Sequence, residues 1–201
     1  MAKQRDAKQL VRDEVRRKVG QMESGTRLSR SEEVCARIIA SRAWAEAQAI
    51  FAFVSLPDEI ETTRLCEAAL EQGKLLALPR FGEEGLVFFA VEELGVLRDD
   101  NSMAIHQPPR DLPVVASSGE PRAPGKLLIV TPGRAFTLEG DRLGRGGGFY
   151  DRFFSALRGE QIPFQAIGVA FALQIYPELP VEAWDERVDG VVTDGDTRGL
   201  V

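Results

Sequence analysis

Apolar and polar residues alternate at helical spacing in the first part of the chain. Residues 3–19 therefore predict an amphipathic helix, whose apolar stripe is expected to consist of Ala7, Leu10, Val11, Val15 and Val19. Lys8, Arg12 and Arg16 follow one another at intervals of four on another face. Lys8 and Arg12 are expected to project together away from the core.

Three further segments also have a helical pattern. Ser29, with Glu32 three residues later, has the spacing of a capping box, which predicts the start of a second helix. Residues 62–72 predict a helix that is closed by Gly73. Residues 149–157 predict another helix, with aromatic residues gathered on one side.

Short, continuously apolar runs between these helices are typical of buried strands. They cover residues 49–54, 74–78, 86–91, 126–130, 165–170 and 188–193. Pro79 is expected to stop the second run, and residues 108–125, rich in Pro, Ser and Gly, are expected to form a surface excursion. Strands that alternate with helices indicate an α/β fold. We expect a single domain over residues 1–201, with three layers and a largely parallel, Rossmann-like sheet flanked by helices.

Composition and charge exclude several classes of protein. With 25 Lys and Arg against 31 Asp and Glu, the net charge of −6 excludes a generally basic nucleic-acid binder. The longest apolar run, residues 166–173, is far shorter than the about 20 residues that span a membrane. The amino terminus opens with charged residues rather than a secretory signal. We therefore expect a cytoplasmic protein without nucleic-acid or membrane partners. We also expect a monomer, although the sequence itself does not determine the oligomeric state.

The cysteine and histidine content limits the possible metal and disulfide chemistry. Cys35 and Cys66 both lie in apolar-periodic segments, which favours reduced core thiols over a disulfide scaffold or a structural zinc site. The single histidine, His106, excludes a site built from several histidines.

The charge is unevenly distributed along the chain. Residues 1–18 hold seven basic and three acidic residues, a net charge of +4, which leaves −10 for the remainder. The first segment can therefore attract an anion that the rest of the chain repels.

Three loops at the expected carboxyl ends of strands carry unusual residues: 55–60, 131–133 and 140–148. The third has five glycines together with Arg142 and Arg145, directly before the helix predicted from residue 149. Glycines let backbone N–H groups gather around an anion, and a helix N-terminus adds partial positive charge. The loop therefore predicts an anion or phosphate site, although it matches neither GxxxxGK[ST] nor GxGxxG. A flexible hairpin tip is the alternative.

Two carboxylates accompany this loop. Asp151 lies in the first turn of the predicted helix, where its charge would either stabilise the helix dipole or hold Mg²⁺ against phosphates. Asp185, just before the last predicted strand, is a candidate second carboxylate for the same rim.

Taken in order along the chain, these segments resemble the 5-formyltetrahydrofolate cyclo-ligase family, also called 5,10-methenyltetrahydrofolate synthetases. Residues 142–151, RLGRGGGFYD, are similar to the signature glycine loop of the family, which is highly specific. Residues 8–12 resemble its N-terminal basic helix that contacts ATP, and residues 58–62 resemble its folate-binding segment. Weaker matches are Pro79-Arg80, Gln107-Pro108, Pro132-Gly133, Trp184-Asp185, Val188-Asp189 and Thr193.

The resemblance implies an ATP- and Mg²⁺-dependent ligase that closes 5-formyltetrahydrofolate into 5,10-methenyltetrahydrofolate. The implied mechanism phosphorylates the formyl oxygen with the γ-phosphate of ATP. The tenth-position nitrogen of the folate then attacks the activated carbon, and phosphate leaves. Such phosphoryl transfer needs mainly positioning and charge neutralisation, which glycines, arginines and Mg²⁺ can supply.

The resemblance also implies an ATP site lined by Lys8, Gln9, Leu10, Val11, Arg12, Arg142, Leu143, Gly144, Arg145, Gly146, Gly147, Gly148, Phe149 and Tyr150. The folate substrate would contact Val54, Glu59, Arg145, Gly146, Gly147, Gly148 and Phe149, with Glu59 binding the donor nitrogens of the pterin. Asp151 and Asp185 match the Mg²⁺-associated carboxylates, and Arg145 and Asp151 are the expected catalytic residues.

One departure from the family pattern lies in the segment after Pro-Gly. Members usually have Asp after the Phe of this segment, whereas Thr137 follows Phe136 here and offers only a hydroxyl. This implies weaker activity or a helper group supplied elsewhere. Two alternative functions remain open: a non-catalytic folate- or nucleotide-binding homologue, and an α/β enzyme like a phosphosugar isomerase or acyl-CoA transferase.

Overall fold

The structure, a computed structural model, describes residues 2–82, 85–98, 106–117, 120–121, 123, 125–195 and 197–199. Its helices are α1 (Ala2–Gly20), α2 (Ser24–Ile39), α3 (Arg42–Glu46), α4 (Thr63–Glu71) and α5 (Phe149–Gly159), with 3-10 turns at Leu94–Val96 and Ala172–Gln174. Its strands are β1 (Ala49–Phe51), β2 (Leu75–Gly82), β3 (Gly85–Ala90), β4 (Val114–Ser117), β5 (Glu120–Pro121), β6 (Leu127–Pro132), β7 (Ala135–Phe136), β8 (Arg142–Leu143), β9 (Phe164–Ala170), β10 (Gly190–Thr193) and β11 (Thr197–Arg198).

Within the described residues, nine strands form one sheet in the order β11-β10-β9-β6-β1-β2-β3-β4-β5, and β7 and β8 form a separate hairpin. The five strands from β10 to β2 are parallel, and Ile50 of β1 lies in register with Leu76 on one side and Leu128 on the other. Beyond β2 and β10 the pairing becomes antiparallel. The predicted α/β fold with a largely parallel sheet is therefore confirmed for its centre.

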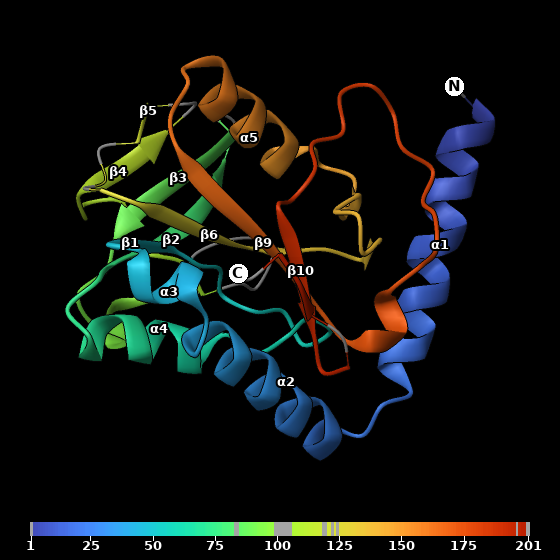
Figure 1. Cartoon of the computed structure of the whole chain (residues 1–201), viewed down its shortest axis with the longest axis horizontal. Coiled ribbons are helices and arrows are strands. Elements are labelled where there is room, and N and C mark those ends of the chain that lie inside the picture. Colours follow the sequence, from blue (N-terminus) through green and yellow to red (C-terminus); the bar gives the residue numbers. More distant parts are fainter. Residues whose placement is uncertain are drawn as a thin grey trace.

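Helices cover both faces of this sheet (Figure 1), as the three-layer prediction requires. Neighbouring residues of β1 point to opposite faces, because side chains alternate along a strand. Ile50 packs in the core under α2 and α4, whereas Phe51 packs in the core under α5. The ring centroids of Phe51 and Phe88 are 4.6 Å apart, and those of Phe88 and Phe153 are 5.0 Å apart.

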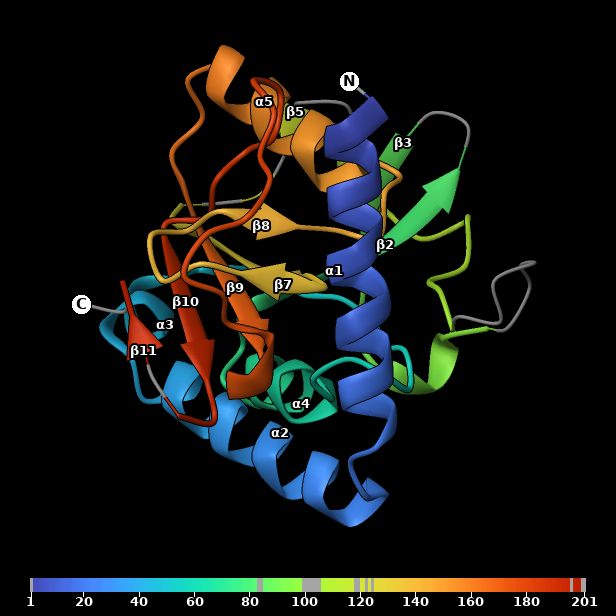
Figure 2. The same cartoon turned by 90° about the vertical axis from the view of Figure 1, so that its right-hand side faces the viewer.

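Helix α1 stands against one end of the sheet, in front of β7 and β8 in Figure 2. Val15 and Val19 are fully buried, but Leu10 is 72% exposed, so its predicted place in the apolar stripe is wrong. Successive residues turn by about 100°. The face that carries Val15 and Val19 therefore continues back through Arg12 and Lys8, and Leu10 lies on the opposite side.

The start of α2 differs from the prediction. The helix begins at Ser24, and Ser29 and Glu32 lie inside it, so the predicted capping box is wrong. The backbone N–H of Arg27 already donates to the carbonyl oxygen of Glu23, which places regular helix before Ser29.

Two expectations about strands are also wrong. Strand β2 continues through Pro79 to Gly82. Its pairing with β1 ends at Ala77, so no hydrogen bond to β1 requires a backbone N–H at Pro79. The segment 108–125 contains β4 and β5, which extend the sheet, although part of it lies outside the described residues.

The predicted strand 49–54 is shorter in the structure, since β1 ends at Phe51, and the following predictions agree with it. Helices α4 and α5 and strands β3, β6, β9 and β10 lie where their patterns predict them, within a few residues. Cys35 and Cys66 are buried and free. None of the helices in the described ranges is both long and apolar enough to cross a membrane.

Candidate active site

The three loops that the sequence singles out contact one another near the carboxyl ends of β1 and β6. Residues 55–60 follow β1, and the predicted loop 131–133 is shorter, because β6 continues to Pro132. The predicted loop 140–148 contains β8 of the separate hairpin, so only residues 144–148 form the loop that leads into α5. Side chains connect all three: Arg134 and Arg145 both donate hydrogen bonds to the carboxylate of Asp58. The predicted convergence of these loops is confirmed.

The glycine loop, residues 144–148, joins β8 to α5. Gly146 and Gly148 have φ values of +107° and +64°, which residues other than glycine rarely adopt. Gly148 is the N-cap of α5 and has no side chain to bond the first N–H groups of the helix. These groups are therefore available to an anion.

Arg145 ties the glycine loop to the loop after β1. Its Nε donates to Glu59 Oε1 at 3.0 Å, while its Nη2 donates to Asp58 Oδ1. The other oxygen of Glu59 accepts a hydrogen bond from the backbone N–H of Leu56 at 3.0 Å. A predicted phosphoryl-binding arginine and a predicted folate-binding carboxylate are therefore direct partners in this structure.

Asp58 also forms an ion pair with a buried arginine. Arg134 is buried, and its Nη1 donates to Asp58 Oδ2. Partial burial opposes ionisation of Asp58, but the hydrogen bonds and positive charges of Arg134 and Arg145 outweigh it and hold the pKa of Asp58 below its usual value.

Arg142, Leu143 and Tyr150 are buried, so Arg142 is not the exposed loop cation that the sequence suggests. Arg142 Nη2 instead donates to Asp151 Oδ1 at 2.7 Å, and the side chain of Arg142 is only 3% exposed. The guanidinium also lies 5.5 Å from the ring centre of Tyr150, and burial raises the pKa of this phenol. Because Arg142 is buried and already paired, an anion at this end of the loop would meet backbone groups rather than its guanidinium.

Lys8 also points inward, contrary to the prediction that it projects into solvent. Its Nζ lies 2.6 Å from Glu182 Oε2 and 2.6 Å from Asp185 Oδ2. Burial disfavours the charged ammonium, but the hydrogen bonds to both carboxylates outweigh it and raise the pKa of Lys8.

The rest of the basic segment is divided between two sides of α1. Arg12 Nε donates to the carbonyl oxygen of Gly144 at 2.9 Å, which attaches the helix to the glycine loop. Val11 is partly buried against the core. Gln9 and Leu10 lie on the exposed side, where Gln9 Nε2 donates to Asp13 Oδ1 at 3.1 Å. Of the five residues expected to contact ATP here, Lys8 and Arg12 contact other residues of the site.

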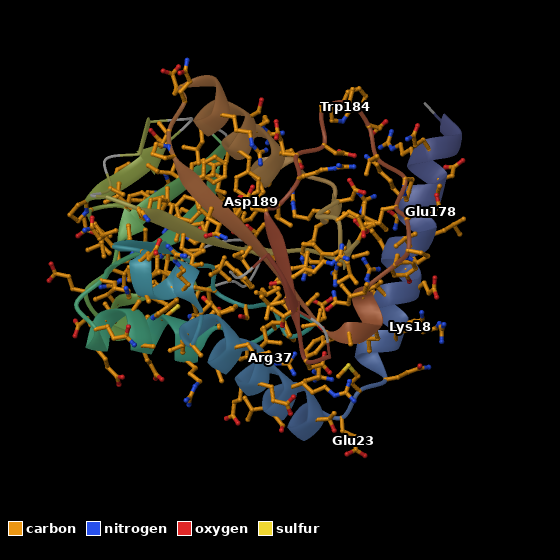
Figure 3. The ribbon with its side chains drawn as sticks, viewed as in Figure 1. Lys18, Glu23, Arg37, Glu178, Trp184 and Asp189 are labelled. Atoms are coloured by element: carbon orange, nitrogen blue, oxygen red, sulfur yellow. The ribbon has the colours of Figure 1, made fainter. Side chains whose placement is uncertain are left out.

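The loop between β9 and β10 lies against α1. Figure 3 shows Glu178 beside α1 and Trp184 at the outer turn of this loop. Within it, the backbone N–H of Glu182 donates to Asp185 Oδ2 at 2.8 Å. The backbone N–H of Glu186 donates to Asp151 Oδ1 at 3.2 Å, so the segments that carry Asp151 and Asp185 lie side by side.

The two carboxylates expected to bind Mg²⁺ are each paired with a protein cation. Asp151 and Asp185 use one oxygen each for these pairs, and we find no donor to the other oxygen among the described residues. No group of three or more His, Cys, Asp or Glu side chains in the described ranges could hold a metal ion. Mg²⁺ commonly binds one or two carboxylates together with substrate phosphates. The two free oxygens fit that mode, with the remaining ligands coming from outside the protein.

Thr137 has a structural role in the turn of the β7–β8 hairpin. Its buried hydroxyl accepts a hydrogen bond from the backbone N–H of Asp141 at 3.0 Å, and lies 3.3 Å from Asp141 Oδ2. A hydroxyl is therefore sufficient to close this turn, and Asp141 supplies a carboxylate beside it.

A cavity lies next to Glu59. Its volume is about 260 Å³, and it lies between the first turns of α2 and the loop after β1, with Ser24, Arg27, Leu28, Ser31, Ser55, Leu56, Pro57, Glu59 and Glu61 as its lining. Val54 is partly buried against the core on the way to this loop. Phe149 packs edge-on against Phe81, with 5.3 Å between ring centroids.

Sequence reasoning missed Glu182 and Arg134 as members of this site. Glu182 lies three residues before Asp185 in a segment without periodicity, and Arg134 follows Pro132-Gly133 with no neighbouring charge to mark it. The position of Arg134 directly after a strand and a Pro-Gly pair is the one local signal that could have indicated it.

Comparison with known proteins gives concordant results at three levels. The sequence profile of the 5-formyltetrahydrofolate cyclo-ligase family matches residues 4–194. The 5-formyltetrahydrofolate cyclo-ligase of Mus musculus is 30% identical over 192 residues, which cover 92% of this chain and 93% of the mouse protein. That of Escherichia coli K12 is 33% identical over 150 residues, or 73% of this chain and 78% of the bacterial protein. The NMR structure of Aquifex aeolicus 5,10-methenyltetrahydrofolate synthetase superimposes with a TM-score of 0.79 at 26% identity, covering 96% of this chain and 92% of that one.

Proposed function

The chain belongs to the 5-formyltetrahydrofolate cyclo-ligase family, and from this premise we propose that it converts 5-formyltetrahydrofolate and ATP into 5,10-methenyltetrahydrofolate, ADP and phosphate. The observation that carries the proposal is the direct contact of Arg145 with Glu59. This contact brings the glycine loop, which suits phosphate, against the loop whose carboxylate suits the donor nitrogens of a pterin.

On the ATP side, the chain offers backbone N–H groups at the start of α5 and the cations of α1. Arg12 is already attached to Gly144, so a phosphate in the glycine loop would lie beside its guanidinium. Lys8 would reach the same phosphates by leaving Glu182 and Asp185. Arg145, which is 41% exposed, would neutralise charge on the phosphoryl group during transfer.

On the folate side, Glu59 would accept hydrogen bonds from the amino and ring N–H groups of the pterin. Transfer of the γ-phosphoryl group to the formyl oxygen makes the formyl carbon electrophilic. The tenth-position nitrogen then attacks that carbon and loses its proton to solvent, and the bond from carbon to the phosphorylated oxygen breaks to release phosphate. Positioning by Glu59 and the glycine loop suffices for these steps, since no protein nucleophile is needed.

The Mg²⁺ that accompanies ATP in this proposal would be held by Asp151 and Asp185. When bound, it neutralises charge on the phosphate oxygens. Asp151 would remain oriented by buried Arg142 while its second oxygen faces the metal.

We place this activity in the cytoplasm and assign it to a monomer. Two buried free thiols suit a reducing compartment.

The test is a spectrophotometric assay with ATP, Mg²⁺ and 5-formyltetrahydrofolate, which follows the long-wavelength absorbance of the methenyl product. ADP should appear in step with that absorbance, and omission of either substrate should abolish both signals. Binding of 5-formyltetrahydrofolate without turnover would instead support a non-catalytic folate-binding protein. ADP release that does not depend on folate would refute the proposed coupling.

A further inference from the structure

We propose that Asp58 is a positioning residue for Arg145, anchored by Arg134, and that it holds the glycine loop in place once substrate occupies Glu59. The inference rests on the proposed function for the roles of Arg145 and Glu59. The anchoring itself rests on contacts within the chain.

Arg145 uses different nitrogens for its two carboxylate partners. Nε faces Glu59 and Nη2 faces Asp58. Loss of one contact therefore leaves the other geometrically intact. A substrate that takes the carboxylate of Glu59 would remove the first contact, and Asp58 would remain as the anchor of Arg145.

Asp58 is suited to this task because its second oxygen is held by a fixed cation. Arg134 is 4% exposed, and its backbone N–H donates to the carbonyl oxygen of Leu143 at 2.7 Å. Its carbonyl oxygen accepts a hydrogen bond from Gln174 at 2.9 Å. The backbone of Arg134 is therefore fixed by hydrogen bonds on both its N–H and its carbonyl oxygen. Asp58, which is bonded to Arg134, in turn holds the more exposed Arg145 in place.

The charges also explain why a carboxylate between Arg134 and Arg145 would assist the reaction. Arg145 without Asp58 would be drawn to Glu59 alone, and substrate would then have to compete with that ion pair. With Asp58 present, release of Glu59 leaves Arg145 paired. We therefore expect loss of Asp58 to lower turnover and to weaken the binding of folate, while the binding of ATP changes little.

The experiment compares Asp58→Asn with the parent protein at saturating ATP and 5-formyltetrahydrofolate. We expect kcat to fall about tenfold or more, while the KM for ATP changes less than about threefold. Asp58→Glu, which keeps the charge, should recover part of the lost kcat. If thermal unfolding shows that Asp58→Asn does not fold, Asp58→Ser takes its place.

Glu46→Gln is the matched control. Glu46 also bridges two cations, Arg42 and Lys126, but it lies before β1, at the opposite end of that strand from Asp58. Its substitution should leave kcat within about twofold of the parent. An equal fall in kcat for both variants would overturn a specific role for Asp58.

A double-substitution cycle separates positioning from a general loss of structure. In an Arg145→Ala background, Asp58→Asn should change kcat less than about twofold, because the group through which Asp58 acts is absent. If Asp58→Asn lowers kcat by the same factor in both backgrounds, the proposal is overturned.

A second readout does not depend on activity. Hydrogen exchange of the backbone amides of residues 144–148 should be about fivefold or more faster in Asp58→Asn than in the parent, and unchanged in Glu46→Gln. Unchanged exchange in Asp58→Asn would overturn the anchoring. A parent protein without cyclo-ligase activity would refute the proposed function instead, while the exchange result would still decide the anchoring.

Discussion

Lys8 Nζ lies 2.6 Å from Asp185 Oδ2, although 177 positions separate the two residues in the sequence. A cation expected to bind ATP and a carboxylate expected to bind Mg²⁺ therefore neutralise each other. Entry of Mg²⁺ and ATP together would give each of them a new partner of opposite charge. Binding of ATP without the metal would leave Asp185 exposed to the phosphates.

Replacement of Lys8 should affect both stability and ATP binding. We expect Lys8→Met to lower the free energy of unfolding by about 1.5–3 kcal/mol, because Glu182 and Asp185 lose a charge-assisted partner. The KM for ATP should rise about tenfold or more. Denaturant unfolding and initial rates measure the two effects. Arg16→Met, which removes an exposed cation of the same helix, is the control and should change neither.

Asp151→Asn should reduce turnover at a given Mg²⁺ concentration and also destabilise the fold. The carboxylate neutralises Arg142, whose charge is buried, and an amide does so less well. We expect the Mg²⁺ concentration for half-maximal rate to rise, and the melting temperature to fall. Asp13→Asn, on the exposed side of α1, provides the comparison. An Asp151→Asn protein with the parental Mg²⁺ dependence would rule out a metal-binding role.

Glu59→Gln should raise the KM for 5-formyltetrahydrofolate more than the KM for ATP. The amide loses one acceptor and adds a misplaced donor toward the pterin. A charge-assisted hydrogen bond contributes about 1.5–3 kcal/mol, which corresponds to roughly a tenfold or greater rise in KM. Steady-state kinetics with each substrate varied in turn provide the measurement, with exposed Glu67→Gln as control. A change confined to the KM for ATP would show that Glu59 belongs to the other ligand.

Thr137→Asp, which introduces the residue usual in the family, should destabilise this protein rather than activate it. The new carboxylate would face that of Asp141, which lies 3.3 Å from the present hydroxyl. We expect the melting temperature to fall, and the second substitution Asp141→Asn to restore part of the loss. Higher turnover in Thr137→Asp alone would mean that the family carboxylate has a chemical role that Thr137 does not fill.

The thiols should be protected in the folded protein over a wide pH range. Burial raises the pKa of both Cys35 and Cys66 to about 12, well above the ordinary value of 9.0. Because the folded-state pKa is the higher one, protonated thiols stabilise the fold below about pH 9, and this contribution is lost as the pH rises toward about 12. A thiol reagent at pH 8 should react slowly with the native protein and rapidly in denaturant. Rapid reaction of the native protein would contradict this burial.

Local patterns in the sequence predict the helices, the buried strands and the glycine loop, because periodicity and glycine content depend on near neighbours. The inward position of Lys8 could not be predicted in this way, since it depends on Glu182, which lies 174 positions away. The burial of Arg142 could not be predicted for a related reason: Arg142 lies in the β7–β8 hairpin, whose strands of two residues each leave no periodic signal. The continuation of β2 through Pro79 likewise depends on where its partner β1 ends.

The strand order has a consequence for how the chain folds during synthesis. Strands β1 to β5 form one side of the sheet in chain order, and the other edge of β1 stays unpaired until β6 joins it. Residues 49–51 of that edge are wholly buried in the finished protein. A nascent chain that has not yet reached residue 127 thus exposes an apolar strand edge that can pair with another chain. Pairing of β6 with β1 covers this edge.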